Sequence, residues 1–175
     1  MADRAIRAVA RDDFALVSLA ARRGAAAALA ATVRRELGAT LPVPGTWTAA
    51  GDLTFICTAP GQWLVMQARD DGALLARLTV AVQACGLLID LSDSRVAVCI
   101  AGAGAREVLA KGLPLDLHPR AMRAGDAAAT VAAHVPVLVR QLDDAPTYEL
   151  MCARSLAGSL HRWLALAGAP VAAGG

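Results

Sequence analysis

The sequence is poor in charged and aromatic residues. Charged residues make up 18% of its 175 residues, and only six residues are aromatic. The formal net charge of +2 is too small for a protein that binds nucleic acid mainly by neutralising phosphates. So few aromatic residues also argue against a surface on which bases stack. A hydrophobic fraction of 57% argues against disorder, so we expect a folded chain whose apolar surface is partly covered by a partner.

Lysine and bulky apolar runs are also scarce. The chain has 42 alanines, and its 16 arginines outnumber a single lysine, Lys111. No apolar run approaches the roughly 18 residues of a membrane-spanning helix. The first 11 residues contain three arginines and no apolar segment of the kind that opens a signal peptide. These features predict a cytoplasmic protein with a core of its own.

The four cysteines lack the spacing of a metal or redox site. Cys57, Cys85, Cys99 and Cys152 form no Cys-x-x-Cys pair, and each lies in an apolar stretch. Zinc sites and redox motifs need such paired spacing. We therefore predict buried free thiols in a reducing compartment.

The usual catalytic and cofactor motifs are missing as well. Gly102 and Gly104 begin like a dinucleotide-binding turn, but Glu107 stands where the third glycine would be. The histidines, His118, His134 and His161, are too far apart for a paired ligand motif. No nucleophile elbow of the form Gly-x-Ser-x-Gly occurs. We predict no catalytic, cofactor-binding or metal-binding residue in this chain.

Alternating and helical hydrophobic patterns are clear along the chain. Leu29, Val33 and Leu37 recur at a helical spacing before Gly38, a residue that favours a helix end. Asp70 and Asp71 are suited to cap the start of a second helix. The predicted strands and remaining helices cover residues 14–19, 53–58, 63–67, 74–86, 87–91, 95–100, 104–112, 127–132, 135–141, 148–152 and 155–167.

The order of these elements predicts the fold class. From Trp63 to Ala132 the elements follow a β-α-β-β-α-β order, which is typical of the ferredoxin-like split βαβ arrangement. We therefore expect an α+β fold with this core and additional antiparallel strands. The expected organisation is an N-terminal strand, helix and connector (1–45), the α+β core (46–168) and a flexible tail (169–175).

A few residues stand out as candidate structural or contact residues. Asp90 interrupts an apolar strand, and a buried carboxylate is costly unless it is paired. We predict a structural ion pair with Arg95, with a ligand-binding or catalytic role for Asp90 as the alternative. Trp63, Trp163, Leu41 and Pro42 are the candidate contact residues of an interface.

A set of segments in a fixed order carries a family resemblance, and together these segments span residues 38–164, which is most of the chain. They are Gly38–Pro44, Pro60–Val65, Leu88–Arg95, Ile100–Gly112, Leu115–His118, Gly125–Thr130 and Arg154–Leu164. The ordered set resembles the gamma subunit family of heterotetrameric sarcosine oxidase, which is itself similar to the folate-binding T-protein of the glycine cleavage system. The acidic turn that relatives carry before Trp63 is replaced here by Ala-Pro-Gly-Gln.

The resemblance implies a T-protein-like fold and a role in sarcosine catabolism and one-carbon metabolism. Such a complex oxidises sarcosine to glycine, reduces oxygen to hydrogen peroxide, and passes the methyl carbon to tetrahydrofolate or releases it as formaldehyde. The resemblance places FAD, FMN, NAD and the tetrahydrofolate site in the alpha and beta subunits and zinc in the delta subunit. The gamma chain is then a non-catalytic structural partner of these three subunits.

Two other interpretations remain open on the sequence. One is a stand-alone folate-binding protein of the T-protein kind, in which Asp90 faces the pterin. The other is a small regulatory α+β module that forms homodimers.

Overall fold

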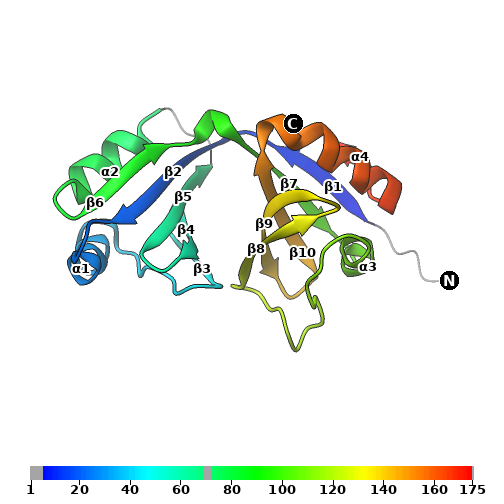
Figure 1. Cartoon of the computed structure of the whole chain (residues 1–175), viewed down its shortest axis with the longest axis horizontal. Coiled ribbons are helices and arrows are strands. Elements are labelled where there is room, and N and C mark those ends of the chain that lie inside the picture. Colours follow the sequence, from blue (N-terminus) through cyan, green and yellow to red (C-terminus); the bar gives the residue numbers. More distant parts are fainter. Residues whose placement is uncertain (1–5, 69–71, 175) are drawn as a thin grey trace. The chain divides into compact units, whose positions relative to one another are not determined.

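The computed structural model describes residues 6–68 and 72–174. The chain divides into two compact units, one formed by Asp13–Asp93 and the other by Met1–Asp12 together with Ser94–Gly175. We call them the continuous and the discontinuous unit. This division differs from the expected boundaries at residues 45 and 168. The first 45 residues supply strand β1 (Arg7–Arg11) to the discontinuous unit, and strand β2 (Phe14–Ala21) and helix α1 (Ala26–Leu37) to the continuous unit (Figure 1).

The continuous unit is a sheet covered on one face by two helices. The strands stand in the order β3-β4-β5-β2-β6, and every neighbouring pair is antiparallel. Helix α1 (Ala26–Leu37) ends at Gly38, whose φ of 64° suits glycine. Helix α2 (Leu74–Val82) lies next to α1 and against β6. The strands are β2 (Phe14–Ala21), β3 (Trp47–Ala50), β4 (Leu53–Ala59), β5 (Gln62–Ala68) and β6 (Gly86–Asp90).

The discontinuous unit has the same plan but borrows a strand from the start of the chain. Its sheet order is β11-β1-β7-β10-β9-β8. Helices α3 (Ala105–Ala110) and α4 (Ala157–Ala167) pack on the core of this unit. The strands are β1 (Arg7–Arg11), β7 (Arg95–Ala101), β8 (Ala127–Ala132), β9 (Val135–Asp143), β10 (Thr147–Ala153) and β11 (Val171–Ala172).

The two units are related by an internal structural duplication. In the continuous unit the chain order β2-α1-β4-β5-α2-β6 gives the split βαβ arrangement, with β3 added beside β4. The discontinuous unit repeats this order with β7 in the place of β2, α3 in that of α1, β9 in that of β4, β10 in that of β5 and α4 in that of α2. Strand β8 is added beside β9, as β3 is beside β4. In the continuous unit β6 pairs with β2. In the discontinuous unit the equivalent partner of β7 is β1, which comes from the other end of the chain. The expected α+β class and split βαβ arrangement are therefore present, once in each unit.

The predicted assignment of residues 63–132 to one split βαβ core is wrong. The predicted element order is correct, but β5 and β6 belong to one sheet while β7 and β8 belong to the other. Strand β2 lies between β5 and β6, and β10 and β9 lie between β7 and β8. The inserted strands β2, β9 and β10 lie outside residues 63–132, so the pattern within that stretch did not indicate them.

The ends of the expected elements also need correction. Residues 169–175 were expected to be flexible, yet Ala169 is buried and β11 pairs in parallel with β1. The strands β1, β3 and β11 were not predicted. Asp70 and Asp71, the expected caps of α2, lie outside the described residues. None of the described helices is long and apolar enough to span a membrane.

Each unit has its own hydrophobic core. Leu19, Phe55, Val65 and Leu78 are among the fully buried residues of the continuous unit. Val98, Ile100, Leu150 and Leu164 are among those of the discontinuous unit. Burial of this kind contributes about 1.5–3 kcal/mol for each large aliphatic side chain, so each unit can stabilise its own sheet.

Candidate functional site

Trp63 holds the proline-containing connector of the continuous unit. This side chain is only 7% exposed, and its Nε1–H donates a 2.9 Å hydrogen bond to the carbonyl oxygen of Pro42. Pro42 is buried and Leu41 is half-buried, whereas Val43 is 65% exposed. The structure thus brings together three of the four expected contact residues. Since Trp63 and Pro42 are buried within the chain, the exposed apolar side chains of this connector are those of Val43 and Pro44, beside the half-buried Leu41.

Trp163 lies at a junction of the discontinuous unit. Its ring packs so closely on Gly112 that a Cβ at that position would be 2.5 Å from Trp163 Cζ2. The Gly112 carbonyl oxygen accepts a 3.0 Å hydrogen bond from the Ala133 N–H, at the β8–β9 turn. Lys111 Nζ donates to the Ala167 carbonyl oxygen at the end of α4 at 2.6 Å. The half-buried indole of Trp163 therefore helps to join α3, α4 and a hairpin turn.

Asp90 is exposed. The ion pair with Arg95 was expected because a buried carboxylate needs a partner, and an exposed carboxylate has no such need. Its Oδ1 accepts hydrogen bonds from the Ser92 N–H at 2.9 Å and from Ser92 Oγ at 2.7 Å. These two bonds, the backbone one first, lower the pKa of Asp90. Ser92 Oγ also accepts from the Leu16 N–H at 3.0 Å. Asp90 therefore organises the turn after β6, and its ion pair with Arg95, which lies in the other unit, stays a prediction.

A buried charged cluster that the sequence analysis did not single out lies in the discontinuous unit. Glu149 Oε1 accepts from Arg140 Nε at 2.7 Å, and Oε2 accepts from Arg11 Nη1 at 3.1 Å. The side chains of Glu149 and Arg140 are 2% and 5% exposed. The register places Glu149 of β10 opposite Arg140 of β9 and opposite Cys99 of β7. Such a pair can be tolerated inside a protein because the opposite charges meet at hydrogen-bond distance.

The glycine-containing turn before α3 lacks the features of a phosphate-binding turn. Gly102 has a φ of 116°, which explains the glycine at this position. Helix α3 has only six residues, and Glu107 lies in its first turn. A carboxylate there would repel a pyrophosphate near the helix start. The turn therefore serves to connect β7 to α3.

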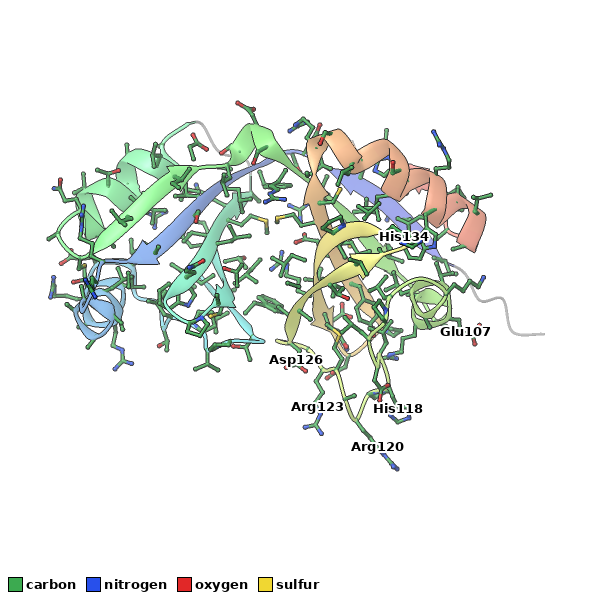
Figure 2. All side chains as sticks on the ribbon, in the orientation of Figure 1. Glu107, His118, Arg120, Arg123, Asp126 and His134 are labelled. Carbon is green, nitrogen blue, oxygen red and sulfur yellow. The ribbon has the colours of Figure 1, made fainter. Side chains whose placement is uncertain are left out.

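A loop with exposed basic residues follows α3. Figure 2 shows His118, Arg120 and Arg123 extending from this loop. The Arg120 N–H donates to His118 Nδ1 at 3.2 Å, and the Arg123 N–H donates to Asp126 Oδ2 at 2.8 Å. Leu117 and Met122 anchor the loop in the core. The loop therefore presents its arginines from a fixed backbone, a feature that neither motif nor periodicity indicated.

The remaining candidate ligands do not gather at one place. His134 lies in the β8–β9 turn with a φ of 75°, and His161 lies on α4. No group of three or more His, Cys, Asp or Glu side chains suited to a metal ion occurs within residues 6–68 and 72–174. All four cysteines are free thiols, as predicted, and Cys57, Cys85 and Cys152 are buried, but Cys99 is only half-buried. Burial raises the pKa of Cys57, Cys99 and Cys152.

Comparison with known proteins decides the family. The model of the sarcosine oxidase, gamma subunit family matches residues 22–170. The chain belongs to the sarcosine oxidase gamma subunit family. It is 34% identical over 106 residues to a sarcosine oxidase subunit gamma from Corynebacterium sp. (strain P-1), covering 60% of this chain and 51% of that protein. It is 42% identical over 65 residues to one from Arthrobacter sp., covering 37% of this chain and 32% of that protein. The aligned regions thus span a third to a half of these relatives.

Solved structures agree with the family assignment. A chain of the heterotetrameric sarcosine oxidase from Corynebacterium sp. U-96 matches with a TM-score of 0.81 and 30% identity, over 95% of this chain and 85% of that one. Aminomethyltransferase T of the glycine cleavage system from Bartonella henselae matches with a TM-score of 0.65 at 14% identity, over 96% of this chain and 47% of that one. The expected T-protein-like fold is confirmed by this second match, which concerns the fold alone.

Proposed function

We propose that the chain is a non-catalytic gamma subunit that completes and supports a heterotetrameric sarcosine oxidase. The observation that carries the proposal is the match to a chain of such an enzyme over 95% of this sequence, at a TM-score of 0.81. In the proposed complex, sarcosine is oxidised to glycine, oxygen is reduced to hydrogen peroxide, and the methyl carbon passes to tetrahydrofolate or leaves as formaldehyde.

The polar groups of the chain support a structural role. The Glu149 carboxylate is engaged by two arginines, and the Asp90 carboxylate is engaged by Ser92. Burial raises the pKa of Cys99 and Cys152, so their thiols are poorly suited to act as nucleophiles near neutral pH. On the family resemblance, we also propose that FAD, FMN, NAD and tetrahydrofolate belong to the alpha and beta subunits and zinc to the delta subunit.

Co-expression tests the proposal directly. The full chain carries an affinity tag and is produced with the alpha, beta and delta subunits encoded in the same genome. We expect the captured material to contain all four chains, to show flavin absorbance, and to produce hydrogen peroxide from sarcosine. If the tagged chain is recovered without flavin-containing subunits, the proposed function is wrong.

Two further measurements separate the structural role from its alternatives. Omitting the gamma chain from the same co-expression should lower the yield of the assembled complex. The isolated chain is also titrated with tetrahydrofolate. Saturable binding in the micromolar range would instead favour a folate-binding protein of the T-protein kind, whereas no saturable binding supports the structural role.

A further inference from the structure

The internal duplication reveals one difference between the edges of the two sheets. Strands β3 and β8 hold equivalent places, and each ends its sheet in the described part of the chain. At the opposite edge β6 and β1 are equivalent, but β1 is covered by the extended segment Val171–Ala172, β11. Strand β6 is the last strand of its sheet among residues 6–68 and 72–174. The same structural position is thus covered by a strand in one unit and left as an edge in the other.

The backbone of β6 is arranged to receive another strand. The Leu91 N–H donates to the Leu16 carbonyl oxygen at 2.7 Å, and the Arg22 N–H donates to the Cys85 carbonyl oxygen at 2.9 Å. Cys85 and Leu91 thus both point their backbone groups toward β2 or its end. The direction of backbone hydrogen bonding alternates along a strand, so the N–H and C=O groups of Leu87 and Ile89, which lie between them at even spacing, also point toward β2. The corresponding groups of Leu88 therefore point away from the sheet.

The side chains of this edge are apolar and exposed. Leu87 is 49% and Ile89 is 62% exposed, and both alternate with Leu88, which packs on the helix-covered core. Proteins usually protect an open edge strand with lysine, proline or a bulge. The charged residue of β6 is Asp90 at its end, whose carboxylate accepts hydrogen bonds from Ser92 in the following turn. The preceding residues Gly86–Ile89 contain no charge and no proline, and their pairing with β2 is continuous. An unprotected apolar edge of this kind is suited to pair with another strand.

We propose that the β6 edge is an assembly surface that receives an extended segment of a partner subunit as an added strand. The segment would bond to the outward-facing backbone groups of β6 and carry alternating apolar residues that cover Leu87 and Ile89. The chain itself contains an example of such an added strand, because β11 covers the equivalent edge of β1. The inference rests on the proposed function, since it takes the partner from the heterotetramer.

Charge substitutions at the edge test this surface in the complex. The tagged full chain is co-expressed with the alpha, beta and delta subunits as wild type and as Ile89→Lys and Leu87→Lys. Val80→Lys is the matched control, because Val80 lies on α2 of the same unit and is 79% exposed. We expect capture of the partners to fall about tenfold or more for the two edge variants and to stay unchanged for the control. Thermal unfolding of each isolated variant checks that it is folded.

Hydrogen exchange then tests whether a strand is added. In the isolated chain the Leu88 amide should exchange faster than the Leu87 and Ile89 amides, which bond to β2. In the complex the Leu88 amide should become protected, and the other two should change little. Loss of capture together with this protection supports the proposal.

The outcomes that oppose the proposal are distinct. Equal capture by wild type and Ile89→Lys would overturn it while leaving the proposed function intact, and so would a captured complex in which Leu88 stays unprotected. A dimer of the isolated chain that Ile89→Lys abolishes would mean that a second copy occupies the edge, and would also overturn it. If the wild-type chain captures no partner, the proposed function itself fails.

Discussion

At the scale of single residues, the buried carboxylate of Glu149 is the most consequential group. It lies between Arg140 and Arg11 at 2.7 and 3.1 Å. The sequence around it shows only an alternation in which Tyr148, Leu150 and Cys152 face the core. That alternation predicts an exposed glutamate on the other face, and the structure buries it instead.

Replacing Glu149 with Gln tests the importance of this charge. The variant keeps the shape of the side chain but leaves the buried Arg140 guanidinium without its carboxylate. We expect the free energy of unfolding to fall by about 3–5 kcal/mol, measured by urea denaturation. Glu36→Gln is the control, because the Glu36–Arg35 pair is exposed and should cost less than about 1 kcal/mol. Equal losses in the two variants would contradict this prediction.

The Asp90–Ser92 turn gives a prediction about pH. Ser92→Ala removes the hydroxyl donor and should raise the pKa of Asp90 toward its usual value of 3.8, as followed by NMR titration. The folded state lowers the pKa of Asp90, so the hydrogen bonds of this turn stabilise the protein at a pH above the usual pKa of the aspartate. This stabilisation is lost as the pH falls through the lowered pKa of the folded state. Ser18→Ala, in the same unit, is the control and should leave the Asp90 titration unchanged. An unchanged midpoint in Ser92→Ala would show that the hydroxyl is unimportant.

At the scale of secondary-structure elements, the contact between Gly112 and Trp163 links α3 to α4. A Cβ at Gly112 would overlap the indole ring, and no other atoms lie within 4 Å of a Cβ built at Gly158, on α4. We expect Gly112→Ala to lower the free energy of unfolding by about 1–3 kcal/mol, because the ring must shift in a packed site. Gly158→Ala should be neutral or stabilising by up to about 1 kcal/mol. Thermal unfolding of both variants measures the difference, and a neutral Gly112→Ala would show that Trp163 repacks freely.

Most individual elements could be predicted from local patterns, because such patterns report which side of an element is buried. The helical spacing of Leu29, Val33 and Leu37 predicted α1, and Gly38 predicted its end. The short strands β1 and β11 could not be predicted in this way. They contain few residues, and each is stabilised by pairing with a distant segment. The exposure of Asp90 was missed for a related reason, since the sequence does not show that β6 lies at an edge.

At the scale of the whole molecule, the sequence pattern could not predict which strands pair with one another. Residues 63–132 follow the split βαβ order, yet the arrangement occurs twice with different members. The β2–β5 and β1–β7 pairs join segments that are far apart in sequence. The four candidate contact residues stay a prediction: Trp63 is buried and bonded to Pro42. The apolar β6 edge and the basic loop carry no recognisable motif, so the sequence pattern did not indicate them. The family resemblance, by contrast, depends on ordered segments and was confirmed.

Because the discontinuous unit depends on β1, a substitution in that strand should weaken one unit more than the other. Ala8 is buried in its core, opposite Ile100 of β7 and Val171 of β11. Ala8→Asp places an unpaired carboxylate there, at a cost of several kcal/mol. We expect hydrogen-exchange protection to fall in β7 and β11 but to persist in β2 and β5, because the continuous unit has a core of its own.

Arg7→Asp is the control, since Arg7 is exposed on the same strand, and should leave both patterns unchanged. Equal loss in both sheets of Ala8→Asp would show instead that the two units unfold as one cooperative body.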